Sequence, residues 1–356
     1  MRDKMEDITC ELARVKDYLL GKDIKPLFIQ NDSLKVLNEL PENSIDCVIT
    51  SPPYWQKREY ENGGIGLEES PQEFINTILL FTREIKRVLK NEGSFWLNIG
   101  DSYKNKNLQG IPWRIAIKMM DEQGWILRNE IIWNKIKGGM DNTKDRLGNN
   151  HEPFFHFVKK KKYYYDVDSI RTNPKQTKVV NGSVVSATGV TGVKYKRQIE
   201  LSTTLTNQQK KNALVALESM INDLNEGKVS DFRMVINKQQ RATHSGSTKL
   251  SGRAKELEEK GFYFLKYNPK GSKPNDVWDI LPEDTQRNDS HSAPYPEDLV
   301  RIPILATCPM DGVVLDPFSG TGTTSLVAFQ NGRKSIGIDL SAEYIETSRE
   351  RMNLLV

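Results

Sequence analysis

The sequence predicts an α/β fold in which a mostly parallel sheet is interrupted by a long insertion. Short buried strands alternate with amphipathic helices over residues 24–171, and the alternation returns over residues 275–356. Between them, residues 172–274 are polar and basic and lack this pattern. Alternating strands and helices are typical of a parallel sheet with crossover helices. We therefore expect one α/β domain built from both ends of the chain, with residues 172–274 inserted into it.

The first half contains the clearest elements. Ser70-Pro-Gln-Glu73 is a capping box with proline at the first helical position, and apolar residues follow it at three- and four-residue spacing. This pattern predicts a helix that runs to about Lys90 and is stopped by Glu92-Gly93. A further helix is expected to close at Gly124. The complete set is strands at 45–50, 94–99 and 126–133, and helices at 71–90 and 111–123.

The insertion and the second half are read in the same way. Asn-Gly and Thr-Gly pairs punctuate residues 181–192, and Gln208–Glu226 keeps the apolar spacing of one helix. After the insertion, Val313–Leu315 and Ser335–Ile338 are predicted as short buried strands, each followed by a helix.

Charge is distributed unevenly along the chain. Between Arg171 and Lys273 there are 19 lysines and arginines against 8 aspartates and glutamates, a net charge of +11. The whole chain carries +4, so the remainder carries −7. A basic region inside an acidic chain is how a nucleic-acid footprint confined to one module looks, although a solvated surface insertion gives the same pattern.

Composition narrows the class of protein. The apolar runs are too short to span a membrane, and the first 23 residues carry mixed charges without the apolar core of a secretion signal. The three cysteines lack metal-ligand spacing, and the four histidines are scattered. We expect a reduced, cytoplasmic protein with no membrane association and no metal site.

The run Thr50-Ser51-Pro52-Pro53-Tyr54 directly follows the apolar strand at 45–50. Two prolines stiffen the backbone and remove two N–H donors, which leaves carbonyl acceptors between a hydroxyl and an aromatic ring. Such a site can hold a flat group that bears an amine, such as a nucleobase. On its own the run favours an ordinary turn at the end of a strand.

A glycine loop lies near the other end of the chain. A predicted strand ends in Asp316, turns through Gly320 and Gly322, and opens into a helix, while Asp339 ends the next strand 23 residues later. An acid at that place can accept hydrogen bonds from ribose hydroxyls. Asp316 would repel a pyrophosphate but would attract the sulfonium and ammonium groups of S-adenosylmethionine. We therefore favour that cofactor over NAD, with a nicotinamide-dependent dehydrogenase as a distant alternative.

Together these residues resemble the β-group of amino DNA methyltransferases, which methylate N4 of cytosine or N6 of adenine. Asp316-Pro-Phe-Ser-Gly-Thr-Gly322 resembles their cofactor motif and Ser51-Pro-Pro-Tyr54 their catalytic motif, in the β-group order. Further matches are Gln30-Asn-Asp32, Trp96-Leu-Asn-Ile-Gly-Asp101 and Ser292-Ala-Pro-Tyr-Pro-Glu297. The resemblance covers roughly 24–171 and 275–354, but not the insertion.

The resemblance implies a Rossmann-like S-adenosylmethionine-dependent methyltransferase fold, with seven mostly parallel strands, one antiparallel strand and an inserted target-recognition region. It implies a catalytic half at 24–171, recognition at 172–274 and a cofactor-binding half at 275–356. The implied cofactor-binding residues are Asp32, Asp316, Phe318, Gly320, Gly322, Thr323 and Asp339. The helix beginning near Pro296-Glu297 resembles the one that packs along the methionine moiety.

The chemistry implied is positioning of a poor nucleophile. If the Ser51 hydroxyl and the Pro52 carbonyl accept the two amine hydrogens, the nitrogen lone pair can point at the sulfonium methyl. Tyr54 would stack on the flipped base, and Pro53 completes the catalytic run. Cytosine-C5 chemistry needs a cysteine nucleophile in Pro-Cys, whereas this chain has only Cys308-Pro309. Serine at the first motif position resembles the N4-cytosine enzymes, with N6-adenine as the alternative.

Double-stranded DNA is the expected partner, because the large basic insertion favours it over the RNA or protein substrates of related methyltransferases. A DNA-binding protein with an inactive catalytic fold remains an alternative, and a cognate restriction endonuclease is a further partner that the family implies. The expected DNA contacts are Lys194, Lys196, Arg197, Arg233, Lys238, Arg241 and Arg253.

Overall fold

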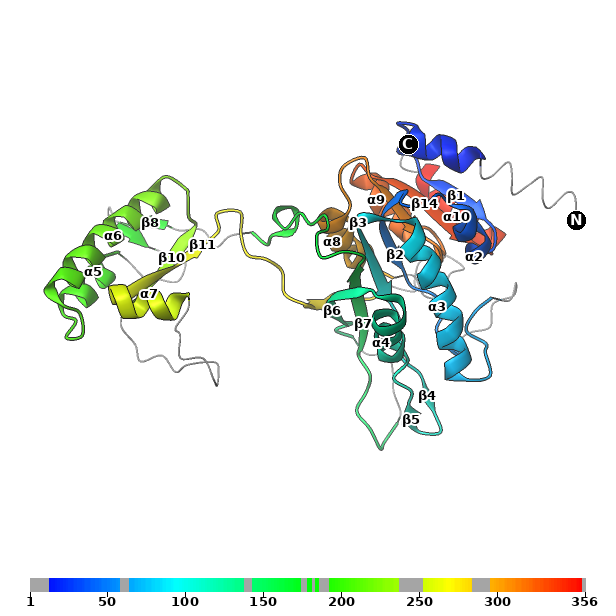
Figure 1. Ribbon diagram of the computed structural model, residues 1–356, viewed down its shortest axis with the longest axis horizontal. Helices are drawn as coiled ribbons and strands as arrows, with labels where there is room; N and C mark the ends of the chain where they lie inside the picture. Colours follow the sequence, from blue (N-terminus) through cyan, green and yellow to red (C-terminus); the bar gives the residue numbers. More distant parts are fainter. Residues whose placement is uncertain are drawn as a thin grey trace, which may run out of the picture. The chain divides into compact units, whose positions relative to one another are not determined.

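The structure is a computed structural model that describes residues 13–57, 64–137, 143–173, 178–180, 183–185, 192–236, 252–283 and 295–353 (Figure 1). The chain divides into two compact units, Met1–Ile170 with Asn275–Val356 and Arg171–Pro274. We call them the catalytic unit and the inserted unit. None of the helices in the described ranges is long and apolar enough to cross a bilayer.

A single large sheet forms the centre of the catalytic unit. Its strands, in spatial order, are β1 (Leu27–Gln30), β14 (Lys334–Asp339), β13 (Val313–Asp316), β2 (Ile45–Thr50), β3 (Leu89–Asn98), β7 (His151–Val158), β6 (Ile126–Asn134) and β12 (Val277–Asp279). All neighbours are parallel except at β7, which runs antiparallel to both β3 and β6. The expected single antiparallel strand is thus present.

The expected count of seven strands is wrong, because the residues that the structure describes already form eight strands in this sheet. The extra strand is β12, only three residues long, which pairs in parallel with β6 through Val277 and Ile132. The neighbouring Asp276 carbonyl also accepts a hydrogen bond from the Ile132 N–H. An unpaired edge leaves backbone groups open, so the chain that returns from the insertion covers the edge of β6.

The direction of winding changes between β13 and β2. From β13 the chain crosses to β14 through α9 (Thr323–Gln330), whereas from β2 it crosses to β3 on the other side through α3 (Pro71–Val88). Ligands of open α/β sheets bind outside the carboxyl ends of the strands at such a switch point. The topology therefore places the site at the ends of β13 and β2.

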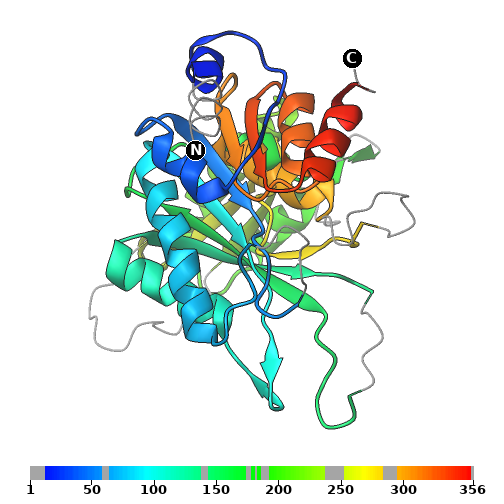
Figure 2. The same cartoon turned by 90° about the vertical axis from the view of Figure 1, so that its right-hand side faces the viewer.

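Helices cover both faces of this sheet (Figure 2). On one face α2 (Ser33–Glu39), α3 and α4 (Ile111–Gln123) bury Leu37, Phe74 and Ile115 against the strands. On the other face α8 (Glu297–Thr307) and α9 bury Leu299, Ile304 and Val327, and α10 (Ala342–Asn353) packs Ile345 beside Phe28. The remaining elements are the hairpin β4 (Tyr103–Lys104) and β5 (Asn107–Leu108) and a short 3-10 helix at Asp168–Ile170.

Local signals account for most element ends. The capping box at Ser70 and Glu73 is formed, and α4 closes at Gly124 in a left-handed conformation with φ of 65°. The expected end of α3 is wrong, because the helix stops at Val88 and β3 already starts at Leu89. Pairing of Leu89 with Ile45 takes the chain into the sheet, and Gly93 lies within β3. A Cβ at Gly93 would lie 2.7 Å from the Asp46 carbonyl oxygen, so this close approach needs glycine.

The inserted unit has its own small core. It contains β8 (Lys178–Val180), β9 (Ser183–Val185), α5 (Gly192–Glu200), α6 (Asn207–Asn225), β10 (Asp231–Ile236), α7 (Arg253–Lys260) and β11 (Phe262–Tyr267). The antiparallel pair β10 and β11 packs Phe232 and Phe262 against Tyr195 of α5 and Leu217 of α6. The helix expected at 208–226 is α6, which starts with a capping box at Thr206 and Gln209.

Candidate active site

The two motifs meet at the switch point of the sheet. Ser51 follows β2, Asp316 ends β13, and the two strands pair in parallel through Val48 and Leu315. The Thr50 hydroxyl donates to Asp316 Oδ1 at 2.7 Å, which joins two residues 266 positions apart in the chain. The loop that would hold the methyl acceptor and the loop that would hold the cofactor therefore start from hydrogen-bonded neighbours.

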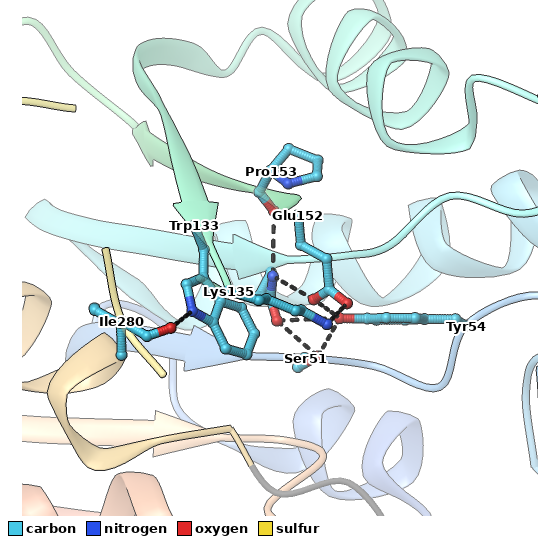
Figure 3. Close-up of polar contacts among 8 residues, drawn as sticks. Ser51, Tyr54, Trp133, Lys135, Glu152, Pro153 and Ile280 are labelled. Carbon is cyan, nitrogen blue, oxygen red and sulfur yellow. Dashed lines mark hydrogen bonds and ion pairs between the residues drawn. The ribbon is translucent and has the colours of Figure 1, made fainter. Parts of the chain in front are cut away.

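Ser51 is hydrogen-bonded within a network of polar side chains (Figure 3). Its Oγ lies 3.3 Å from Asn98 Oδ1 and 3.2 Å from the Tyr54 hydroxyl. The Tyr54 hydroxyl lies 3.1 Å from Asn98 Oδ1 and donates to Glu152 Oε2 at 2.8 Å. Asn98 is the last residue of β3 and Glu152 is the second residue of β7, so neighbouring strands supply partners for a side chain at the end of β2.

Glu152 is in turn paired with Lys135. The Lys135 ammonium lies 2.5 Å from Glu152 Oε1, and both side chains are largely shielded, at 29% and 15% exposure. The same ammonium lies 4.8 Å from the centre of the Trp133 ring, whose N–H donates to the Ile280 carbonyl at 2.8 Å. Figure 3 shows these residues converging from separate elements on Ser51 and Tyr54. Glu152 therefore joins the Lys135 ammonium to the Tyr54 hydroxyl and the Asn98 amide, and hydrogen bonds to a carboxylate are strong enough to hold these groups in place.

The Tyr54 ring rests on the backbone of Gly100. A Cβ at Gly100 would come within 2.6 Å of Cε2 of the ring, so a larger residue there would displace Tyr54. The next residue, Trp55, is buried, and its carbonyl accepts from the Ser102 hydroxyl at 2.7 Å. These contacts fix the turn after β2. Pro52 is buried and Ser51 and Pro53 are partly buried in the same turn.

Asp316 receives four hydrogen bonds at the end of β13. Thr50 Oγ1 and the Phe318 N–H donate to Oδ1, and the Tyr295 hydroxyl and Thr324 Oγ1 donate to Oδ2. The side chain is buried, and burial raises the pKa of the carboxyl while the four donors oppose that rise. Burial beside this carboxyl also raises the pKa of Tyr295 well above its usual value, so Tyr295 stays a donor.

The glycine loop is held from behind by α10. Gly320 and Gly322 have φ of 50° and 79°, and Gly322 caps α9 in the left-handed region that favours glycine. The Ser348 hydroxyl donates to the Gly320 carbonyl at 3.1 Å. Arg351 Nη1 donates to the Thr321 carbonyl at 2.7 Å and lies 3.3 Å from Thr323 Oγ1. Thr323, one of the expected cofactor residues, thus directs its hydroxyl to Arg351.

The other expected cofactor residues lie at the same edge of the sheet. Asp339 ends β14, accepts from the N–H groups of Gly320 and Ser341 at 2.9 Å each, and has a pKa raised by burial. Asp32 caps α2 after β1, with its carboxylate on the Lys35 N–H at 2.9 Å. The Phe318 ring packs 5.0 Å from that of Phe81. The three carboxylates therefore stand at the ends of the adjacent strands β1, β14 and β13.

This donor set fits S-adenosylmethionine better than a dinucleotide. Residues 316–323 contain no lysine or arginine to neutralise a pyrophosphate, and the buried carboxylate of Asp316 would repel one. The same negative charge suits the sulfonium and ammonium groups, and Asp339 suits ribose hydroxyls. Within the described residues, Ser319 Oγ is buried without a hydrogen-bond partner, so the loop also offers a hydroxyl to a ligand.

The expected DNA contacts belong to the inserted unit. Lys194, Lys196 and Arg197 are exposed on α5, and Arg233 is exposed on β10. Arg253 is exposed at the start of α7, with its guanidinium 6.0 Å from the Tyr263 ring. Lys238 and Arg241 lie outside the described residues.

Sequence reasoning assigned no role to several residues of this site. Thr50, Asn98 and Tyr295 stood inside quoted motifs, and only the structure shows their hydrogen bonds to Asp316 and Ser51. Glu152 and Lys135 were missed entirely. A signal existed for Glu152, because it lies two residues before Phe154-Phe-His-Phe-Val158, and a glutamate is unusual so close to a buried strand.

Comparison with known proteins identifies the family of this chain. A sequence profile of the N6/N4 DNA methylase family matches residues 45–350. The Type II methyltransferase M.SfiI of Streptomyces fimbriatus is 29% identical to this chain, and the match covers 88% of this chain and 88% of M.SfiI. The Type II methyltransferase M.SmaI of Serratia marcescens is 28% identical, and the match covers 91% of this chain and 89% of M.SmaI.

Solved structures establish the fold. The cytosine-N4-specific PvuII DNA methyltransferase has a TM-score of 0.57 at 19% identity, over 93% of this chain and 89% of that chain. A putative DNA modification methylase of Thermus thermophilus, in complex with S-adenosyl-L-methionine, has a TM-score of 0.50 at 19% identity, over 93% and 95%. With a profile match over most of its length, the chain belongs to the N6/N4 family of DNA methylases, whose methyl donor is S-adenosyl-L-methionine.

Proposed function

We propose that this chain methylates the exocyclic N4 amine of a cytosine flipped out of duplex DNA, as the modification enzyme of a restriction-modification system. The N6 amine of adenine is the alternative acceptor. The observation that carries the proposal is the hydrogen bond of 2.7 Å between Thr50 and Asp316, which joins the acceptor loop to the cofactor loop. A base held at Ser51 would then lie next to a methyl donor held at Asp316.

Each residue of the acceptor loop has a defined task in this proposal. S-adenosylmethionine supplies an electrophilic methyl group when bound. The Ser51 hydroxyl and the Pro52 carbonyl accept the two hydrogens of the amine, which turns the nitrogen lone pair toward that methyl. Tyr54 supports the flipped base, and stacking of this kind is worth about 1–3 kcal/mol against the cost of flipping.

Serine at position 51 is the reason to place cytosine before adenine, because serine at the first motif position resembles the N4-cytosine enzymes. The relatives alone do not decide, since they include both the PvuII enzyme and the DNA adenine methyltransferase YhdJ of Escherichia coli, 24% identical to this chain. The Type II names of M.SfiI and M.SmaI support a restriction-modification role with a cognate endonuclease.

The basic inserted unit supports duplex DNA as its target. Its net charge of +11 and the exposed cations of α5 suit phosphate contacts, with base edges read in the major groove.

Nucleoside mass spectrometry of DNA treated with the enzyme and S-adenosylmethionine tests the proposal. We expect N4-methylcytosine, formed by the wild type and reduced for Ser51→Ala. N6-methyladenine instead would assign the alternative acceptor, and the absence of both would overturn the proposal. Sequencing of the same DNA gives the methylated site, and protection against an endonuclease that cuts this site tests the modification role.

A further inference from the structure

We propose that Glu152 is a positioning residue that sets the direction of the Ser51 hydrogen bonds, so that Ser51 can only accept from the substrate amine. This inference rests on the proposed role of Ser51 and adds the group that enforces it. Glu152 does not touch Ser51 itself, and it acts through Asn98 and Tyr54.

The first step concerns the amide of Asn98. Its Nδ2 lies 3.3 Å from Glu152 Oε2 and 3.2 Å from the Pro153 carbonyl oxygen. A carboxylate and a backbone carbonyl can only accept, so the side of the amide that faces them must be the NH2 group. Asn98 Oδ1 therefore faces Ser51 and Tyr54 as an acceptor.

The second step concerns the proton of Tyr54. This hydroxyl has one proton, and of its two contacts within the network the shorter is to the Glu152 carboxylate, at 2.8 Å from Oε2 against 3.1 Å from Asn98 Oδ1. Hydrogen bonds to a carboxylate are stronger than those to an amide oxygen, so the Tyr54 hydroxyl donates its hydrogen bond to Glu152. The Tyr54 oxygen then presents its lone pairs to Ser51.

The third step follows for Ser51. Both of its partners in the network, Asn98 Oδ1 at 3.3 Å and the Tyr54 oxygen at 3.2 Å, now act as acceptors. The single proton of Ser51 must point inward to one of them. Its lone pairs are left for the hydrogens of the amine, which is the direction that the methyl transfer requires.

Because Lys135 holds one oxygen of Glu152, the substitution Glu152→Gln should reverse the direction of the hydrogen bonds in the network. The Lys135 ammonium donates a hydrogen bond to Glu152 Oε1. In Glu152→Gln the same ammonium would hold the amide oxygen, and the amide NH2 would replace Oε2. That NH2 would face the donors Tyr54 and Asn98, so a side chain of almost unchanged shape would reverse the polarity of the network.

The test compares Glu152→Gln with Glu152→Ala in single-turnover methylation. If Glu152 sets direction, both variants lose about tenfold to a hundredfold in rate, as is typical for residues that orient a functional side chain, and the glutamine variant is no faster than the alanine variant. Affinity for S-adenosylmethionine stays near wild type in both variants. The unfolding temperature of the alanine variant falls, because Lys135, Tyr54 and Asn98 lose a shielded partner, so the rates are compared well below that temperature. If Glu152 only fills space, the glutamine variant keeps the wild-type rate, which would overturn the proposal. Glu92→Gln, 64% exposed on β3, is the matched control.

A double-mutant cycle of Glu152→Gln with Ser51→Ala measures whether the two residues act on the methylation rate together, which a purely structural role of Glu152 does not predict. Because Glu152 acts through Ser51, Glu152→Gln should have almost no further effect once Ser51 is alanine, whereas independent effects would multiply. Lys135→Met is the second variant if Glu152→Gln does not fold, with an expected loss of about fivefold that also vanishes without Ser51. Multiplying losses in the cycle would overturn the proposal.

The two proposals fail in different ways. If the wild type forms neither methylated amine in DNA, the proposed function is wrong. If the wild type methylates DNA and Glu152→Gln matches it, only the role of Glu152 is wrong.

Discussion

In the catalytic unit, Asp316 is 1% exposed and receives four hydrogen bonds, whereas the cations Lys196 and Arg197 of the inserted unit stand exposed on α5. A buried polar group must be satisfied by fixed partners, so its geometry is set before any ligand arrives. An exposed charge acts through water and is screened by salt. The first arrangement suits chemistry on one atom, and the second suits attraction to a long polyanion.

The largest expected effect is at Asp316. Replacement with alanine leaves the hydroxyls of Thr50, Tyr295 and Thr324 facing a buried gap. The Tyr295 and Thr324 hydroxyls also contact each other, so two of the three groups lose their partner. At about 1–3 kcal/mol for each unsatisfied buried group, we expect the free energy of unfolding to fall by at least about 2 kcal/mol. Urea denaturation measures the loss, and calorimetry should detect little or no binding of S-adenosylmethionine. Unchanged stability would show that the loop does not depend on this carboxylate.

Ser51→Ala should break the chemistry while leaving the scaffold intact. Loss of one positioned hydrogen-bonding group in an active site costs about 100- to 1,000-fold in rate, and we expect a loss of that order in methylation. The affinity for S-adenosylmethionine should stay within about twofold, because the direct contact to the cofactor loop is made by Thr50. A rate equal to the wild type would contradict the role of Ser51.

His156 is a buried polar residue of the catalytic unit that lies outside the two motif loops, and its partners should make the stability of the protein depend on pH. It stacks on Trp96 at 4.1 Å, lies 3.0 Å from Ser94 Oγ, and has a pKa lowered to about 3, mainly by burial. An unfolded histidine takes up a proton below about pH 6.5, so stability should fall as the pH drops from there toward 3.

The expected loss from His156 at pH 5, relative to pH 8, is about 2 kcal/mol. His156→Gln should remove this part of the pH dependence. Burial raises the pKa values of Asp316 and Asp339, which gives the opposite trend, but both proteins share it and it cancels in the comparison. Equal pH dependence of urea denaturation in the two proteins would count against a neutral, buried His156.

The smallest expected effect is on the inserted unit. The double variant Lys196→Ala with Arg197→Ala should weaken DNA binding by about tenfold at low salt, and each lost phosphate contact should reduce the salt slope by about 1. Cofactor affinity should not change. The control removes two exposed cations of the catalytic unit, Arg83 on α3 and Arg114 on α4. An equal loss of DNA affinity in the control would show that DNA does not bind the inserted unit in preference to the catalytic unit.

Local signals were sufficient for most of the fold. The capping box at Ser70, the glycine stop at Gly124 and the buried strands at 45–50 and 313–316 were predictable because each depends on residues close in sequence. The eighth strand was not, because the three residues of β12 are extended only through pairing with β6. The end of α3 was misplaced for the same reason, since pairing of Leu89 with Ile45 overrides the helical pattern.

The sequence by itself determined the two motifs, their order and the chemical types that they offer: a hydroxyl beside two prolines, and a carboxylate before a glycine turn. Those features are local, so spacing and residue type were enough to find them. Only the tertiary structure decided that Thr50 bonds to Asp316, and that Asn98, Glu152 and Lys135 stand behind Ser51. Hydrogen-bond direction depends on which groups face each other across strands, and strand order in a sheet is not written in any local pattern.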